Sequence, residues 1–416
     1  MNKNLNFIDL FAGCGGFSLG LEFSGFTPIF VNEISNEAMM SYLINRKNEF
    51  PHLLKNNCND IKELVCEDGK YLKTLTKNFK KDLNIDVKNG DIDLIVGGPP
   101  CQGFSDINHR RLYSVEKKQL PSNFLYQDMA WIIKQLQPKI FLFENVRGLI
   151  ASKWTKNGKK GEIWEDVQKT FFSLGNYKIE SSLVFARDYG VAQRRPRILL
   201  VGVRDDLDIS KWENSNIANG FLPSPTFGAP DLENLLGDLV DINYVNGGQT
   251  LQYPNEVLND IQKFYRTDKK GNLSKKGSVV TEHKYSRHTS NIEKKFEFML
   301  QNNGNISKNF QTKKFQQRLL PKVWNGTGPN ITATSLPDDF VHFSQPRVLT
   351  VREWARLQGF PDWYEFHGKR TTGGIRRAGN PRVGNFDREL PKYTQIGNAV
   401  PVQLAIAIGE HFKKVL

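Results

Sequence analysis

The chain has 416 residues, a length that allows two or three domains. Its composition, with 39% apolar and 24% charged residues, excludes an intrinsically disordered protein. The formal charge of +13 favours a polyanion, most simply nucleic acid, as a partner, with a merely basic protein as the alternative. No apolar run approaches the roughly 18 residues of a membrane span and the N-terminus lacks a secretory signal, so we expect a cytoplasmic protein.

Strand and helix patterns alternate over the first half of the chain. Strands alternating with helices predict an α/β fold, in which helices cover both faces of a mostly parallel sheet. The last helix, at 400–412, is apolar on one side and should return to this sheet to bury that side. The strands are expected at 5–11, 28–33, 92–98, 139–146 and 197–203, and the other helices at 17–26, 36–45 and 125–137.

Residues 206 to about 345 are rich in Asn, Gly, Lys and Ser and lack this alternation. They predict a second, less regular domain. Two segments, 263–288 and 308–322, are basic with interleaved aromatic residues, as expected for contacts to phosphates. His283 and His288 have no further metal ligand nearby, so we expect surface or phosphate contacts from them. The lysines expected at phosphates are Lys269, Lys270, Lys275, Lys276, Lys313 and Lys314.

A glycine cluster, "DLFAGCGG", separates the first strand from the first helix. Glycines at Gly13 and Gly15 allow a sharp turn and a close approach of the backbone to a ligand. Glu33, at the end of the second strand, can accept hydrogen bonds from both ribose hydroxyls. Together these residues predict a nucleoside-containing cofactor. The spacing departs from the dinucleotide fingerprint, and a plain glycine-rich helix start is the alternative.

A thiol follows a strand in "IVGGPPCQGFS". Pro99 and Pro100 restrict the direction from which the sulfur of Cys101 can attack, as a nucleophile requires. Glu144 ends the next strand and should project at the same edge of the sheet. Arginines in "QRRPR", at 193–197, offer forked donors to a carbonyl oxygen or a phosphate. A buried structural cysteine and a solvated basic turn are the alternative interpretations. The four cysteines form no Cys-x-x-Cys pair, so neither disulfides nor a metal site are expected.

The ordered motifs resemble those of the DNA cytosine-5 methyltransferase family, of the bacterial restriction-modification type. They are "DLFAGCGG", "NE", "GGPPCQGFS", "FENVRG", "YGVAQRRPR", "LTVREWARLQGFPD" and "QIGNAVP", and they span most of the chain. The resemblance implies a Rossmann-like sheet dependent on S-adenosylmethionine, with a smaller, irregular target-recognition domain. It also implies three parts of the chain. These are a catalytic and cofactor-binding domain at 1–205, a target-recognition domain with a hinge at 206–393, and a C-terminal segment at 394–416 that returns to the catalytic domain.

The resemblance assigns roles to individual residues. Cys101 would add to carbon 6 of a flipped-out cytosine, while Glu144 and Arg197 hold the base. Ile34 would flank the adenine of the cofactor. Asn398 would close the site from the C-terminal segment. The remaining cofactor residues would be Phe11, Gly13, Gly15 and Glu33, with Asp60 and Ile61 at the adenine edge.

The resemblance implies sequence-specific methylation of carbon 5 of cytosine in double-stranded DNA by a monomeric enzyme. Such methylation would protect host DNA from a cognate restriction endonuclease. An RNA cytosine-5 methyltransferase is one alternative. The Cys-Phe-Thr tripeptide of the tRNA-acting branch is absent, and a recognition segment of about 140 residues favours DNA. A catalytically silent nucleic-acid-binding protein is the other alternative, and an intact set of Cys101, Glu144 and Arg197 argues against it.

Overall fold

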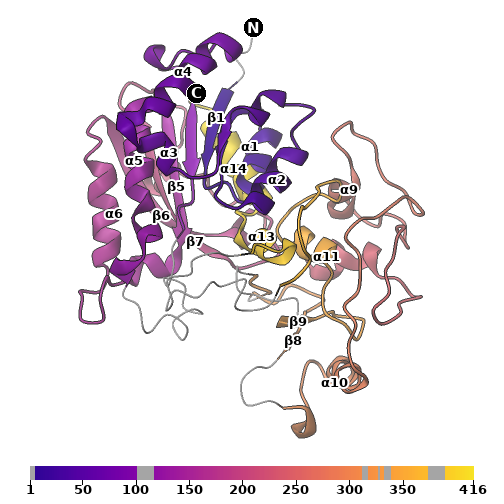
Figure 1. Cartoon of the computed structure of the whole chain (residues 1–416). Helices are drawn as coiled ribbons and strands as arrows, with labels where there is room; N and C mark the ends of the chain where they lie inside the picture. The colour runs from indigo at the N-terminus through magenta and orange to yellow at the C-terminus, as the bar shows by residue number, and fades with distance from the viewer. Residues whose placement is uncertain (1–4, 101–116, 312–316, 327, 332–338, 373–388) are drawn as a thin grey trace.

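A seven-stranded sheet forms the larger part of the molecule, and a smaller, irregular lobe lies beside it (Figure 1). The computed structural model describes residues 5–100, 117–311, 317–326, 328–331, 339–372 and 389–416. Cys101, Lys313 and Lys314 lie outside these ranges. In spatial order the strands are β3 (Asn57–Cys58), β2 (Phe26–Asn32), β1 (Leu5–Leu10), β4 (Leu94–Gly97), β5 (Ile140–Val146), β7 (Pro196–Arg204) and β6 (Tyr177–Phe185).

Strands β1 to β5 run parallel, and β7 runs antiparallel to both of its neighbours. The expected α/β fold with a mostly parallel sheet is therefore confirmed. Strand β6 was not among the strands that the sequence predicted. The direction of β7 matters for the site, because β7 begins at the edge of the sheet where β5 and β6 end.

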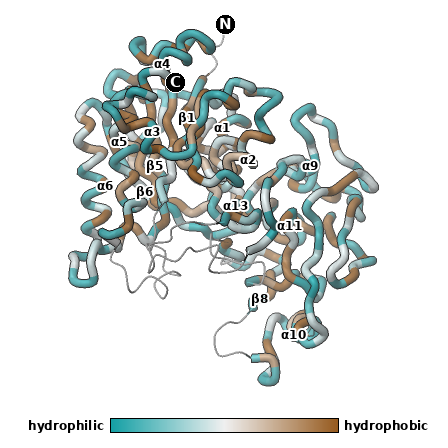
Figure 2. Tube along the Cα trace, viewed as in Figure 1, coloured by the Kyte–Doolittle hydropathy of each residue, from teal (hydrophilic) through white to brown (hydrophobic). Residues whose placement is uncertain are grey.

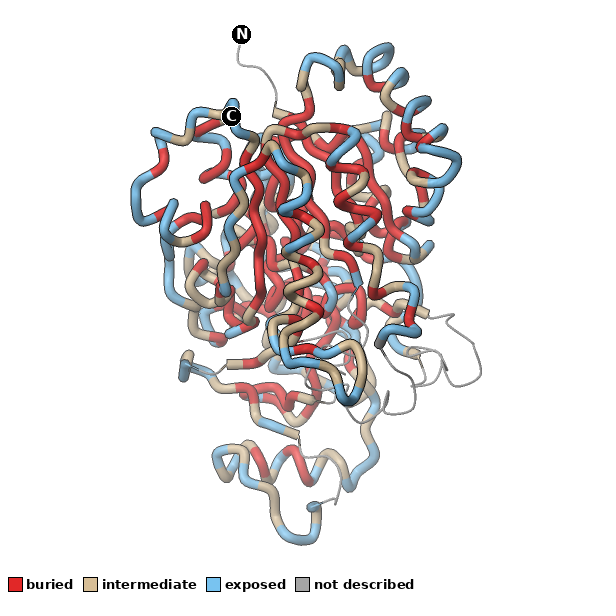
Figure 3. The backbone as a smooth tube through the Cα atoms, turned by 90° about the vertical axis from the view of Figure 1, so that its left-hand side faces the viewer, coloured by how far each residue is buried: buried red, intermediate tan, exposed pale blue. Residues whose placement is uncertain are grey.

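Alternate residues of the central strands enter two separate apolar layers. Ile8 and Phe141 pack with the helices on one face, whereas Phe7 and Leu142 pack on the other, as the period of two in a strand requires. The central strands are accordingly apolar and mostly buried along their length (Figures 2 and 3), whereas the edge strand β6 is partly exposed. The first layer contains α3 (Lys62–Val65), α4 (Lys70–Leu83), α5 (Leu125–Leu136) and α6 (Glu162–Phe172); the second contains α1 (Gly16–Phe23) and α14 (Val402–Phe412).

The two ends of the chain meet in the second layer. Helix α14 lies along α1, and a Cβ at Gly20 would come within 2.4 Å of the Cβ of Ala405, so glycine permits this close packing. The Ser24 hydroxyl also donates to the carbonyl of Ile406. The apolar side of α14 packs in the same layer as Phe7 and Leu142 of the sheet.

The smaller lobe is held together by buried ion pairs as well as apolar contacts. Arg356 pairs with Asp238 at 2.5 Å and with Asp362 at 2.6 Å, and Arg347 pairs with Glu353 at 2.7 Å. Most of its elements are short, consistent with the irregular pattern of the sequence: α8 (Leu232–Leu236), α9 (Asp260–Arg266), α10 (Ser290–Gln301), α11 (Val351–Leu357), β8 (Arg318–Leu319) and β9 (Phe340–Val341). Helix α13 (Lys392–Asn398) lies between this lobe and the turn after β1, because the Trp354 indole donates to the Tyr393 carbonyl and the Cys14 thiol donates to the Gln395 carbonyl.

One expectation for the basic segment 263–288 was wrong. His283 is 2% exposed, and its ring nitrogens lie 2.9 Å from the Thr350 hydroxyl and from the Leu239 carbonyl, so it is a core residue. Lys269 pairs with Glu49 at 2.8 Å, just beyond α2 (Asn36–Ile44). The phosphate contact expected of Lys269 stays a prediction.

The compositional change near residue 206 does not coincide with a change in packing. Trp212, Phe221 and Leu222, around α7 (Asn214–Ala218), belong to the apolar layer that contains α1 and α14. The Trp212 indole donates to the carbonyl of His411 in α14 at 3.0 Å. Among the described residues no helix is long and apolar enough to cross a membrane, and no group of three or more His, Cys, Asp or Glu side chains could hold a metal ion.

Candidate active site

The predicted site residues gather where the parallel strands end. The strand order reverses between β1 and β4, and in such sheets this switch point opens a crevice at the carboxyl edge. Leu10 pairs with Gly97 at the end of these two strands. The turn after β1 and the Gly98–Pro100 segment after β4 therefore lie side by side.

The turn after β1 has an unusual backbone. Phe11 adopts a positive φ of 60°, which costs energy for a residue with a side chain, and Gly13 and Gly15 have φ of 57° and 84°. No described atom lies within 4 Å of the position that a Cβ at Gly13 would take. A Cβ at Gly15, in contrast, would come within 2.8 Å of both Arg46 and Tyr42. Gly13 thus faces open space, whereas Gly15 is required by packing.

Glu33 is buried immediately after β2 and holds this turn. Its two carboxylate oxygens accept hydrogen bonds from the amides of Gly13 at 2.9 Å and Ser35 at 2.8 Å. Burial raises the pKa of Glu33, and these two hydrogen bonds oppose that rise. Each carboxylate oxygen has a second lone pair, so the side chain can still accept from a ligand.

The three residues expected around an adenine have different environments. Ile34 is 69% exposed, and such exposure of a large apolar side chain beside a buried carboxylate suits a ring-stacking surface. Asp60 is exposed as well. Ile61 is 3% exposed in the core, so its side chain is not available and only its backbone could meet a ligand. Sequence reasoning missed Asn59, whose amide donates to the Glu33 carbonyl at 2.9 Å and joins the two segments.

Asn398, the last residue of α13, is exposed near the same edge. Buried Arg195 fixes the backbone around it by donating to the carbonyls of Gly397 at 2.9 Å and Ala399 at 2.6 Å. Arg195 is therefore occupied by backbone carbonyls, and its fork is not free for a ligand. Of the two arginines in the "RPR" triplet, only Arg197 faces the site.

Glu144 and Arg197 meet at the carboxyl edge. The Arg197 Nε lies 2.6 Å from the Glu144 Oε1, and both side chains are nearly buried. The antiparallel direction of β7 brings them together, because it sets Arg197 opposite Val146 at the end of β5. A Cβ at Gly98 would lie 2.9 Å from the Glu144 Oε2, so the segment leading to Cys101 passes directly over this carboxylate.

The environments of the other cysteines argue against them as nucleophiles, since a thiolate is required. Burial raises the pKa of the Cys58 thiol to about 12 and also raises that of Cys14. Cys14 donates to the Gln395 carbonyl at 3.4 Å inside the core. Cys66 is exposed in the segment between α3 and α4.

The segment that leads to Cys101 is anchored to β5, because the Asn145 amide donates to the Pro99 carbonyl at 3.2 Å.

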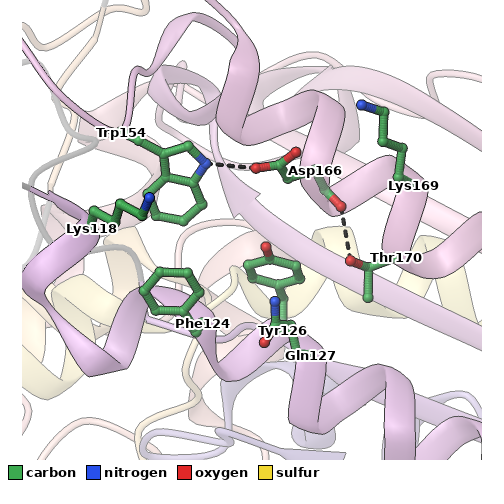
Figure 4. Close-up of a pocket in the computed structure, with 8 residues that line it drawn as sticks. All are labelled: Lys118, Phe124, Tyr126, Gln127, Trp154, Asp166, Lys169 and Thr170. Atoms are coloured by element: carbon green, nitrogen blue, oxygen red, sulfur yellow. Dashed lines mark hydrogen bonds between the residues drawn. The ribbon is translucent and has the colours of Figure 1, made fainter. Parts of the chain in front are cut away.

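A cavity of about 350 Å³ lies elsewhere on this domain, between α5 and α6 (Figure 4). The rings of Phe124 and Trp154 stack at 4.9 Å, and the Trp154 indole donates to Asp166 at 2.7 Å. None of the predicted site residues that the structure describes lines this cavity. Its lining residues are Lys118, Phe124, Tyr126, Gln127, Trp154, Asp166, Lys169 and Thr170.

Comparison with known proteins identifies relatives of this chain. The chain is 32% identical to the type II methyltransferase M.DdeI of Desulfomicrobium norvegicum, over 98% of this chain and 88% of that protein. It is 28% identical to M.XorII of Xanthomonas oryzae, over 98% and 84%. A solved DNA modification methyltransferase encoded within an E. coli prophage superposes with a TM-score of 0.66 and 26% identity, covering 99% of both chains. The sequence model of the C-5 cytosine-specific DNA methylases matches residues 5–414, and the chain belongs to that family.

Proposed function

We propose that this DNA cytosine-5 methyltransferase acts on double-stranded DNA, on a cytosine flipped out of the helix, with S-adenosylmethionine as the methyl donor. The observation that carries the proposal is the Glu144–Arg197 pair at 2.6 Å, beneath the segment that leads to Cys101. A carboxyl group and a guanidinium at one sheet edge, beside a conformationally restricted thiol, can hold the polar edge of a base while the sulfur attacks its ring.

The thiol supplies the activation that cytosine lacks. Carbon 5 is too poor a nucleophile to take a methyl group, so the Cys101 thiolate first adds to carbon 6 and makes carbon 5 nucleophilic. The Glu144 carboxyl group hydrogen-bonds ring nitrogen 3 and stabilises the charge that develops there. After carbon 5 is methylated, loss of its proton restores the ring double bond and expels the thiolate.

The turn after β1 fits a nucleoside cofactor in three respects. No described atom fills the space beside Gly13, Glu33 retains free lone pairs, and Ile34 presents an exposed apolar surface. We assign the ribose to Glu33, the adenine to Ile34 with Asp60, and closure of the site to Asn398, with Phe11 setting the course of the turn. S-adenosylmethionine, when bound, supplies an electrophilic methyl group.

We assign recognition of the DNA sequence to the smaller lobe. The enzyme as a whole is proposed to protect host DNA from a cognate restriction endonuclease. Trp212 and Leu222 pack under the sheet, so we propose that the recognition domain begins after residue 222. Segment 394–416, containing α14, belongs with the catalytic domain. Arg194 is exposed at the carboxyl edge beside Arg197 and is a candidate for a phosphate contact.

Covalent trapping tests the proposal. Fluorine at carbon 5 cannot leave as a proton does, so duplex DNA with 5-fluorocytosine at the target should form a complex with the protein and S-adenosylmethionine that survives denaturation. The mass of the digested peptide should place the adduct on Cys101. Cys101→Ala should form no adduct yet still bind DNA through phosphate contacts, and Cys66→Ala should behave as wild type.

Two outcomes would contradict the proposal. An adduct on Cys14, Cys58 or Cys66, or one formed by Cys101→Ala, would reject Cys101 as the nucleophile. Trapping on tRNA carrying the same base analogue, with none on duplex DNA, would replace DNA by RNA as the substrate.

A further inference from the structure

A buried arginine and a buried tyrosine support the cofactor turn from behind. Arg46, just after α2, is 1% exposed, and its Nη2 donates to the Gly15 carbonyl at 3.2 Å. The Tyr364 hydroxyl donates to the Cys14 carbonyl at 2.5 Å. The Arg46 Nη1 also donates to that hydroxyl at 2.9 Å. Two consecutive carbonyls of the turn are thus held by two connected side chains.

Independent contacts fix the arginine in this position. Its Nε pairs with Glu22 at 2.5 Å, and its guanidinium lies 3.9 Å above the centre of the Tyr42 ring. The Tyr42 hydroxyl in turn lies 2.8 Å from the hydroxyl of Ser18, in the first turns of α1. The guanidinium therefore links α1, α2 and the turn between β1 and α1.

The side chains that hold the turn come from distant parts of the chain. Tyr364 follows α11, in a segment whose other residues also contact α2. Asn45 exchanges hydrogen bonds with the backbone of Glu365, and the His367 amide donates to the Ser41 hydroxyl at 2.8 Å. This segment is therefore docked along α2, the helix that starts beside Glu33.

Glycine at position 15 is explained by this arrangement. A Cβ there would lie 2.8 Å from the Arg46 Nη1 and 2.9 Å from the Tyr364 hydroxyl. At Gly13, in contrast, no described atom lies within 4 Å of the Cβ position, and the amide is bound by Glu33. The turn is thus packed against fixed donors at Gly15, whereas the described atoms leave space for a ligand at Gly13.

We propose that Tyr364 and Arg46 are positioning residues, which orient the peptide groups of Cys14 and Gly15 so that the turn binds the cofactor. This inference rests on the proposed use of S-adenosylmethionine. Neither residue takes part in the chemistry at the base. Loss of the contact should therefore weaken cofactor binding and leave the methyl-transfer step at saturating cofactor unchanged.

The test is calorimetric titration of S-adenosylmethionine into the full-length protein without DNA, so that no turnover occurs. Tyr364→Phe removes only the hydroxyl, and Arg46 keeps Glu22 and the Tyr42 and Gly15 carbonyls as partners. We expect Kd to rise about tenfold, as for the loss of about 1.4 kcal/mol. KM for the cofactor should rise with it, while kcat and the Kd for DNA change less than about twofold.

Tyr177→Phe is the matched control. Its buried hydroxyl donates to the Pro138 carbonyl at 2.7 Å, at the opposite edge of the sheet, so this variant should lose comparable thermal stability without a change in cofactor Kd. Arg46→Lys, which can pair with Glu22 but cannot reproduce the fork, is the second variant and should also weaken cofactor binding.

The outcomes separate this inference from the function on which it rests. Normal cofactor binding by Tyr364→Phe and Arg46→Lys, or an equal loss in Tyr177→Phe, would reject the positioning role alone. A fall in kcat with unchanged KM would reject it as well. Wild-type protein that does not bind S-adenosylmethionine would reject the proposed cofactor and the inference together.

Discussion

Replacing Glu33 by alanine tests the cofactor site most directly. The carboxylate already accepts from the amides of Gly13 and Ser35, and it has lone pairs left for the ribose hydroxyls. Charge-assisted hydrogen bonds contribute about 1.5–3 kcal/mol. Glu33→Ala should therefore raise the Kd for S-adenosylmethionine by roughly 10- to 150-fold.

The structure adds a complication, because the same substitution frees two backbone amides that shape the turn. Part of the loss could then reflect a distorted turn and not a missing contact to ribose. Glu33→Gln keeps one acceptor oxygen, so its Kd should lie between those of the wild type and Glu33→Ala. Glu37→Ala, in the first turn of α2, removes a carboxylate that accepts from the Ser35 hydroxyl and should leave Kd nearly unchanged.

Isothermal titration with a cofactor analogue lacking the ribose 2′-hydroxyl completes a double-mutant cycle. If Glu33 accepts from that hydroxyl, the analogue should bind the wild type more weakly than the natural cofactor, but should lose little further affinity in Glu33→Ala. Equal and additive losses would show that Glu33 acts only through the turn. Unchanged affinity in Glu33→Ala, with the thermal unfolding transition intact, would remove Glu33 from the site.

Three further predictions concern stability, specificity and DNA affinity. Burial raises the pKa of Asp9 to about 7, against about 3.9 in the unfolded chain, so its native form retains a proton that the unfolded chain releases and stability should fall as pH rises from about 4 to 7. The fall in the free energy of unfolding should be at most about 4 kcal/mol, and Asp9→Asn should remove it. Denaturant unfolding of Asp9→Asn that shows the same fall between pH 5 and pH 8 would contradict this. Exchanging residues 224–345 for those of a related enzyme should change the methylated sequence, read by bisulfite sequencing; an active hybrid with the original target would locate recognition elsewhere. Arg194→Gln should reduce the log–log salt slope of DNA binding by about one unit. Lys80→Gln should not, because Lys80, in α4, pairs with Asp86 at 2.6 Å at the opposite end of the sheet (Figure 1); the reverse result would reject this assignment.

The sequence by itself determined the layered α/β core and the order of the motifs. Alternation of apolar residues with a period of two specifies strands locally, and a one-sided apolar helix such as α14 must bury that side on a core. Carboxyl ends of parallel strands share one edge, so the strands alone predicted that Glu33, Glu144 and the Gly98–Pro100 segment would gather there.

Only the tertiary structure decided which polar residues are available at that edge. Arg195 and Arg197 are two residues apart, yet one donates to buried carbonyls and the other reaches Glu144, because β7 runs antiparallel to β5. Nothing in the sequence around Gly15 indicates that Arg46 and Tyr364 pack against it. Contacts between segments hundreds of residues apart depend on how side chains fill the shared space, and local patterns of charge and hydropathy do not contain that information.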